Sequence, residues 1–384
     1  MKTKKRKIAV IAGSRGEYGY FRPIIKEIIK RPNLDYGIIA TNMHVLDSFG
    51  STVDEIKKDR FKIHATLYNT FDGYNHLTMV KSLAVFKMQL PEMLEQMGAD
   101  MLLLAGDRGE QLMAAIVGAY MYIPTAHIQA GEVSGNIDGV ARHAITKLVH
   151  LHFAANEDAA RRVIRLGEEK FRVFNVGAPQ LDELLSVSEI TPKKELYKKL
   201  ELDSEKPVLI VVQHPVTEEF DEAERQMEET MKAVMKFSIP IVIIMGNSDA
   251  GSRVMRNVIT RYRQPNVKIF PSIIRKDYSG LLNIAGAIIG NSSSGILEAP
   301  SFGLPAVNIG NRQKGRVQAK NVINAGYSAS EIEKAITKAL SEKFREKIKN
   351  CGNPYGDGKS SKRIVDILEN IPIDDKLLIK KITY

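Results

Sequence analysis

The chain has 384 residues, of which 44% are hydrophobic and 26% are charged, and it carries a formal net charge of +10. At roughly 150 residues per domain this length predicts two domains, and the composition excludes wholesale disorder. A lone cysteine, Cys351, excludes a disulfide framework, and no uncharged apolar run approaches the roughly 18 residues that a membrane helix needs. We therefore expect a cytoplasmic globular protein whose basic excess reflects an anionic ligand or solvated surface.

Short apolar runs rich in Val, Ile and Leu alternate with longer stretches of helical period along the whole chain. Such runs predict strands buried on both faces, and their alternation with helices predicts α/β architecture with parallel sheets. The expected strands are 8–12, 37–40, 101–105, 125–128, 152–155 and 173–176, then 208–212, 239–245, 267–270, 287–289 and 306–309.

The polar stretch 186–206 separates the two sets of strands and predicts a linker that flanks a short helix. It divides the chain into two doubly wound domains of similar size, 1–190 and 191–360. Residues 360–370 are expected to be helical, so 361–384 forms a C-terminal helix and tail that packs back on the first domain. In such folds ligands bind beyond the carboxyl ends of the strands, so the polar residues directly after each apolar run are candidate site residues in one cleft between the domains.

A Gly/Ser-rich turn, 290–295, follows one of these strands and leads into an expected helix. Its backbone N–H groups and hydroxyls suit an anion, and the helix dipole adds to the attraction. Glu298, one turn into that helix, suits a ribose diol. The alternative is a serine-rich helix cap with Glu298 favouring the helix N-terminus.

Two basic side chains stand at other strand ends. Arg15, at the first strand–helix turn, suits a diphosphate, and its alternative is a surface ion pair with Glu17. His214 suits a phosphate contact or a proton relay, and its alternative is a buried, hydrogen-bonded histidine. The first turn lacks the G-x-G-x-x-G pattern of nicotinamide dinucleotide sites.

Three carboxylates lie near strand ends in the first half: Asp107, Glu132 and Asp138. Carboxylates gathered in one cleft can differ in pKa and act as base and acid. The alternative for Asp107 is a structural one, in which it pairs with Arg108 or Arg142 and caps a helix. No matching Cys or carboxylate joins the histidines of 143–152 in a metal set, and no Asp-x-Asp clamp is present.

Together, in this order and spacing, the motifs resemble those of the hydrolysing UDP-N-acetylglucosamine 2-epimerases of sialic acid biosynthesis, nearly end to end. They are Gly13-Ser14-Arg15 with Glu17-Tyr18, Gly106-Asp107-Arg108, 131–135, Ile137-Asp138, 142–148, 213–217, Asn247 with 249–251, 290–295, 308–310 with Arg312-Gln313, and 353–358.

The resemblance implies two Rossmann-like domains facing a cleft, as in the glycosyltransferase-B class, with UDP mainly on the second domain. Ser292 and Ser293 would hold phosphate, Glu298 the ribose, and main chain near Phe270 the uracil. The remaining nucleotide contacts that the resemblance implies are Arg15, Arg108, His214, Asn247 and Arg312.

The resemblance also implies the reaction. UDP is eliminated across C1 and C2 to give a glycal, and water then adds, so that N-acetylmannosamine and UDP are released without a metal or redox cofactor. Asp107, Glu132 and Asp138 match the catalytic carboxylates, with His143 nearby and His214 beside the diphosphate. We expect Asp107 or Glu132 to transfer the C2 proton and Asp138 to activate water. A homodimer or homotetramer is the family expectation, with no nucleic-acid or membrane partner.

Four alternatives stand beside this interpretation. Related enzymes of legionaminic acid synthesis share most motifs and act on UDP- or GDP-2,4-diacetamido-2,4,6-trideoxyglucose. Non-hydrolysing epimerases are disfavoured, because they usually carry Gly-Asp-Thr where this chain has Gly106-Asp107-Arg108. Outside the epimerases, the alternatives are a two-domain glycosyltransferase and a sugar-nucleotide sensor.

Overall fold

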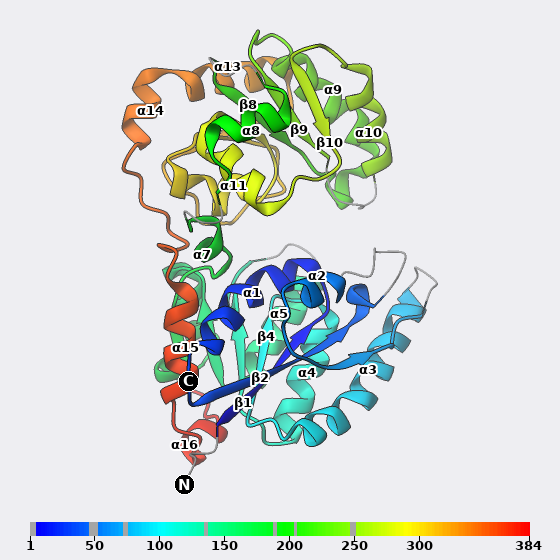
Figure 1. Ribbon diagram of the computed structural model, residues 1–384, viewed down its shortest axis with the longest axis vertical. Helices are drawn as coiled ribbons and strands as arrows, with labels where there is room; N and C mark the ends of the chain where they lie inside the picture. Colours follow the sequence, from blue (N-terminus) through cyan, green and yellow to red (C-terminus); the bar gives the residue numbers. More distant parts are fainter. Residues whose placement is uncertain are drawn as a thin grey trace. The chain divides into compact units, whose positions relative to one another are not determined.

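The computed structural model describes residues 5–45, 53–71, 76–133, 137–186, 190–202, 206–245 and 251–384. The chain divides into two compact units, Met1–Glu183 with Tyr355–Tyr384, and Leu184–Pro354 (Figure 1). Each unit is built on its own parallel sheet with its own hydrophobic core.

The first unit contains a seven-stranded sheet in the order β3-β2-β1-β4-β5-β6-β7, all parallel. Its strands are β1 (Arg6–Ala12), β2 (Leu34–Thr41), β3 (Ile63–Leu67), β4 (Met101–Ala105), β5 (Thr125–Ile128), β6 (Leu151–Ala154) and β7 (Val173–Asn175). The central strands are buried on both faces, which is why they read as continuous apolar runs.

The helices of the first unit cover both faces of this sheet. They are α1 (Arg15–Ile29), α2 (Val53–Lys58), α3 (His76–Met97), α4 (Gly109–Tyr120), α5 (Ile137–Leu148), α6 (Glu157–Arg165), α7 (Gln180–Leu184), α15 (Ser360–Asn370) and α16 (Asp375–Leu378). The last helices return to this unit from the far end of the sequence: α15 packs beside α1 (Figure 1) and places Ile364 and Leu368 in the core.

The second unit contains a six-stranded parallel sheet in the order β10-β9-β8-β11-β12-β13. Its strands are β8 (Val208–Val212), β9 (Ile241–Ile244), β10 (Val267–Phe270), β11 (Ala285–Gly290), β12 (Ala306–Ile309) and β13 (Val322–Ala325). Its helices are α8 (Lys193–Leu200), α9 (Ala223–Val234), α10 (Ser252–Arg261), α11 (Arg275–Ile284), α12 (Ser294–Leu297), α13 (Ala329–Leu340) and α14 (Glu342–Ile348).

The predicted α/β class with two Rossmann-like sheets is confirmed, since β3-β2-β1-β4-β5 and β10-β9-β8-β11-β12 both follow the doubly wound order. Each of the eleven apolar runs overlaps a strand, although the run 239–245 extends beyond both ends of β9, Ile241–Ile244. The sequence analysis missed two of the edge strands, β3 and β13, in which His64, Thr66 and Asn324 interrupt the apolar residues. Within the described ranges no helix is long and apolar enough to cross a membrane.

Candidate functional site

The turn after β1 is fixed by a carboxylate that is hydrogen-bonded to backbone. Ser14 is the N-cap of α1, and Glu17 reaches back in a capping box. Glu17 Oε2 accepts hydrogen bonds from the backbone N–H groups of Gly13 (2.7 Å) and Ser14 (3.1 Å). Burial, together with the nearby Glu110 carboxylate, raises the pKa of Glu17 to about 8. These contacts with Gly13 and Ser14 set the backbone of the turn that carries Arg15.

Asp107, directly after β4, forms an ion pair with Arg142 on α5. The Arg142 side chain is only 5% exposed, and its Nη1 also donates to the Gln129 carbonyl oxygen at 2.6 Å. One arginine thus joins the loops that follow β4 and β5. This is the structural pairing that the sequence left open as an alternative for Asp107, but the capping half of that alternative is wrong, because Arg108 occupies the N-cap position of α4.

A buried histidine supports the backbone just before Asp107. His127 on β5 places its Nε2 2.6 Å from the carbonyl oxygen of Gly106. Burial lowers the pKa of His127 to about 3, so at neutral pH the ring is uncharged and Nε2–H is the donor. The neutral ring therefore fixes the peptide that precedes Asp107.

Glu132 lies at the end of the loop after β5, where the backbone makes an unusual turn. Gln129 and Gly131 both have left-handed φ values, 61° and 75°. A Cβ at position 131 would stand 2.2 Å from the Ala159 carbonyl oxygen, so only glycine fits there. The turn brings Glu132 Oε1 to the Asn156 Nδ2 donor at 2.8 Å, and Asn156 itself caps α6. Glu132 is 9% exposed and held in one orientation.

Another buried carboxylate, Glu110, lies beside Arg108. Glu110 Oε2 lies 3.7 Å from Arg108 Nε, and Asn42 donates its side-chain amide to Glu110 Oε1. Glu110 therefore orients Arg108, whose side chain is partly exposed. The sequence analysis missed Glu17, Glu110, Asn42 and Asn156 as site residues. Glu17 and Glu110 could have been found from the sequence, because each carboxylate lies in the first helical turn that follows a predicted strand.

In the second unit, Asn291 connects the ends of β8 and β11. Its Oδ1 accepts from the backbone N–H of His214 (2.7 Å), and its Nδ2 donates to the His214 carbonyl oxygen (2.8 Å). The Asn291 carbonyl oxygen in turn accepts from Gln313 Nε2 (2.8 Å) and Arg312 Nη1 (3.2 Å). This close approach requires Gly290, because a Cβ there would lie 2.1 Å from the Val212 carbonyl oxygen.

The serine-rich turn differs from expectation in one respect. The helix behind it, α12, has four residues and ends at Leu297, so Glu298 follows the helix rather than lying one turn inside it. So short a helix adds little dipole to anion binding. Glu298 Oε2 accepts from Ser294 Oγ at 2.5 Å, and Tyr278 contacts the same hydroxyl. Burial and the Glu298 charge raise the pKa of Tyr278, which remains a neutral phenol.

The predicted site residues fall into two groups, one in each unit. Asp107, Arg108 and Glu132 lie at strand ends of the first unit, and His143 is exposed on α5 beside Arg142. In the second unit His214, Phe270, Ser292, Ser293 and Arg312 lie at or just beyond strand ends, and Glu298 follows helix α12. Asn247 and the side chains of Arg15 and Asp138 are outside the described residues. Among the described side chains, no group of three or more His, Cys, Asp and Glu could hold a metal ion.

Comparison with known proteins gives matches across almost the whole chain. The family model described as UDP-N-acetylglucosamine 2-epimerase matches residues 26–369. The UDP-N,N'-diacetylbacillosamine 2-epimerase (hydrolyzing) of Legionella pneumophila is 36% identical over 381 residues, covering 99% of this chain and 100% of that protein. The UDP-N-acetylglucosamine 2-epimerase of Neisseria meningitidis serogroup B is 31% identical over 336 residues, covering 88% of both chains.

A solved structure supports the fold. The crystal structure of UDP-GlcNAc 2-epimerase from Neisseria meningitidis bound to UDP-GlcNAc aligns with a TM-score of 0.81 at 21% identity. The alignment covers 94% of this chain and 99% of that one.

Proposed function

Because the chain belongs to the UDP-N-acetylglucosamine 2-epimerase family and is a hydrolysing nucleotide-sugar 2-epimerase, we propose that its substrate is UDP-N,N'-diacetylbacillosamine. The products would be UDP and the 2,4-diacetamido sugar with inverted configuration at C2. The identity of 36% over essentially the full length of both proteins supports this choice, since the Neisseria relative that acts on another sugar stands at 31%. This reverses the order of the two substrates expected from the motifs alone.

UDP-N-acetylglucosamine is the second candidate. Val133 and the stretch 134–138 resemble the enzymes that act on this sugar nucleotide, and the Neisseria meningitidis relative is named for the same substrate. Both sugars carry the 2-acetamido group and the C2 hydrogen, so the chemistry at C1 and C2 is the same for either. The two substrates differ only at C4 and C6.

The chemistry rests on the placement of Asp107 and Glu132 at the ends of neighbouring strands, β4 and β5. In the proposed reaction one carboxylate removes the C2 proton while the C1–O bond to UDP breaks, giving a 2-acetamidoglycal and UDP. The other protonates C2 from the opposite face while water, activated by Asp138, adds its oxygen to C1. Two carboxylates held in different surroundings, one by Arg142 and one by Asn156, suit opposite proton transfers.

We assign the nucleotide to the second unit. Asn291 sets the backbone of His214 and of the serine turn, while Glu298 is held by Ser294 in the orientation that would accept the ribose hydroxyls. Arg312, tied to Asn291 O and exposed, would neutralise the leaving diphosphate. Arg108, which lies beside Glu110, is a further candidate for this neutralising role.

The experiment that tests the substrate is a direct competition. Purified protein is incubated with equimolar UDP-N,N'-diacetylbacillosamine and UDP-N-acetylglucosamine, and each substrate is followed by proton and phosphorus NMR. We expect the diacetamido substrate to disappear at least tenfold faster, releasing UDP and the free sugar. A faster loss of UDP-N-acetylglucosamine would assign the second candidate, and a UDP-linked mannose-configured product would contradict hydrolysis.

A further inference from the structure

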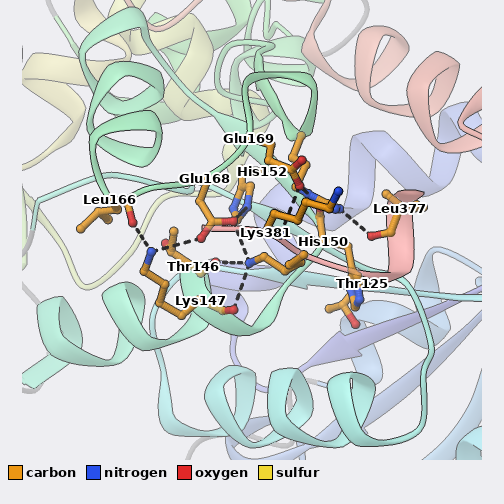
Figure 2. Close-up of polar contacts among 12 residues, drawn as sticks. Thr125, Thr146, Lys147, His150, His152, Leu166, Glu168, Glu169, Leu377 and Lys381 are labelled. Carbon is orange, nitrogen blue, oxygen red and sulfur yellow. Dashed lines mark hydrogen bonds and ion pairs between the residues drawn. The ribbon is translucent and has the colours of Figure 1, made fainter. Parts of the chain in front are cut away.

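The C-terminal segment, residues 374–384, is fixed to the first unit by a fully buried arginine. Arg172 donates to the carbonyl oxygens of Lys376 (2.8 Å), Leu377 (2.5 Å) and Ile379 (3.1 Å), and its Nε pairs with Glu169 at 2.8 Å. Figure 2 shows Leu377 and Glu169 in this cluster. A guanidinium that binds three carbonyl oxygens within four residues holds the segment in one register.

That register places one lysine against the end of helix α5. Lys380 Nζ donates to the carbonyl oxygens of Thr146 and Lys147, each at 3.0 Å, and pairs with Glu168 Oε2 at 2.7 Å. The last carbonyls of a helix have no partner within the helix and carry its negative dipole end, so a cation is favourable there. Lys380 thus occupies the C-terminal end of α5, and only 18% of its side chain is exposed.

Glu168 connects this contact to strand β6. His152 Nε2 lies 3.1 Å from Glu168 Oε2, and Lys147 Nζ lies 3.5 Å from Oε1 (Figure 2). Burial alone would raise the pKa of Glu168, but the hydrogen bonds from His152 and Lys380 bring it down to about 2. Glu168 is therefore an ionised, buried carboxylate whose charge Lys380 balances.

Two sets of contacts connect this cluster to Asp107. The first runs along α5, where Thr146 and Arg142 lie one turn apart. Thr146 Oγ1 donates to the Arg142 carbonyl oxygen at 3.0 Å, and the Arg142 guanidinium pairs with Asp107. Across the sheet, His152 is the register partner of His127, which holds the Gly106 peptide. The same cluster therefore contacts both the helix and the strand that position the catalytic loop.

We propose that Lys380 is a positioning residue for the epimerase reaction, which holds the C-terminal end of α5 so that Arg142 keeps Asp107 in its reacting orientation. This rests on the proposed function. Lys380 touches neither substrate nor the reacting carboxylates, and its effect passes through the helix. The effect should therefore appear in turnover and not in nucleotide binding, because UDP is assigned to the second unit.

The test compares Lys380→Met with Lys381→Met, a control whose side chain is exposed and whose backbone N–H, unchanged in the variant, donates to Glu169. We expect Lys380→Met to lower kcat at least tenfold while the Kd for UDP stays within twofold, since small misplacements of catalytic groups are costly. Lys380→Arg, which keeps a cationic donor, should restore kcat to within threefold. A folded Lys380→Met protein with the kcat of the control would overturn the proposal.

A double variant separates positioning from stability. Lys380→Met leaves Glu168 buried without this cation, so Lys380→Met with Glu168→Gln should recover the melting temperature but not kcat. Recovery of both would show a merely structural role and would overturn the proposal, even if the single variant fails to fold. Hydrogen exchange of the α5 peptides tests the helix contact without any substrate. We expect faster exchange in Lys380→Met than in Lys381→Met. Because this result does not depend on the reaction, a failure of the proposed function can be distinguished from a failure of this proposal.

Discussion

The guanidinium of Arg142 lies between the Asp107 carboxylate and the Gln129 carbonyl oxygen, so that one side chain connects the loops after β4 and β5. Asp107 and Glu132 belong to these two loops. The distance between the proposed acid and base thus depends on a residue that would not itself need to touch the sugar. Arg142 comes from α5, whose position is in turn set at its C-terminal end by Lys380.

Replacing Arg142 should therefore abolish turnover and cost stability. Arg142→Met leaves a carboxylate without its buried partner, and breaking a buried pair in this way costs about 3–5 kcal/mol. We expect the urea midpoint to fall and kcat to drop at least a hundredfold. The control is Arg161→Met on the exposed side of α6. An Arg142→Met protein with near-normal kcat would remove the proposed role of Arg142.

The two carboxylates should fail at different steps. Asp107→Asn and Glu132→Gln should each lower the overall rate by about 10²–10⁴, the usual contribution of general acid–base catalysis. The variant that lacks the base releases no UDP, whereas the variant that lacks the acid releases UDP and accumulates the glycal, which NMR detects directly. Glu157→Gln, an exposed carboxylate on the neighbouring α6, is the matched control. Near-normal turnover in both site variants would contradict their assignment.

We expect Glu298 to contribute to UDP binding only by accepting hydrogen bonds from the ribose hydroxyls. Glu298→Gln should raise the Kd for UDP about tenfold, because hydrogen bonds to a charged group contribute about 1.5–3 kcal/mol. The Kd for 2',3'-dideoxy-UDP, which has no hydroxyl to donate, should change less than twofold. Calorimetry with the two ligands on both proteins completes a double-mutant cycle. An equal loss of affinity for both ligands would show that Glu298 acts through the fold of the turn.

Glu17 should make the protein less stable at alkaline pH. Its pKa is about 8 in the folded protein and near 4.5 in the unfolded chain, so its contribution is complete below pH 4.5 and is lost as pH rises through 8. Glu17→Gln keeps an acceptor for Gly13 N–H and Ser14 N–H but cannot ionise. Its unfolding free energy relative to the parent should rise by up to about 4 kcal/mol between pH 5 and pH 8.5. A pH-independent difference in urea titrations would contradict the buried, protonated carboxyl.

Acid should destabilise the first unit through its buried histidines. Burial lowers the pKa of His127 to about 3 and those of His150 and His152 to about 4. The unfolded chain binds these protons near pH 6.5, so stability falls as pH drops from 6.5 towards 4. His127→Gln retains a donor for the Gly106 carbonyl oxygen but cannot bind a proton. The slope of the unfolding free energy against pH should therefore decrease by the contribution of about one proton. An unchanged slope would show that His127 is charged in the folded protein.

The positions of the central strands could be predicted because these strands are buried on both faces and form continuous apolar runs in the sequence. The strands β3 and β13 could not, because polar residues interrupt both of them, His64 and Thr66 in β3 and Asn324 in β13. The serine turn was located correctly, but the helix behind it is shorter than its composition suggested. Pro300 lies near the start of a 3-10 helix, Ala299–Phe302, directly after α12.

The side chains that carry the proposed chemistry could be listed from the sequence, but their partners were only partly foreseen: Arg142 was one of two alternatives for Asp107, and Asn156 was not considered for Glu132. Asp107 pairs with Arg142 across 35 positions and Glu132 with Asn156 across 24, and no local pattern specifies such pairs. The contact between Lys380 and Thr146 spans 234 positions and arises only because α15 returns the end of the chain to the first sheet. Residues this far apart in the sequence come into contact only through the topology of the fold, which a local motif does not specify.

The most direct test of hydrolytic 2-epimerisation is one NMR experiment in heavy water. UDP-N,N'-diacetylbacillosamine is converted by the purified protein in D₂O, and the C2 position of the released sugar is followed by proton NMR together with the phosphorus signal of UDP. We predict free UDP and a mannose-configured sugar carrying one deuterium at C2, because the proton removed in the elimination is replaced from solvent. A released sugar that keeps its original hydrogen at C2, or its original configuration, would contradict the account.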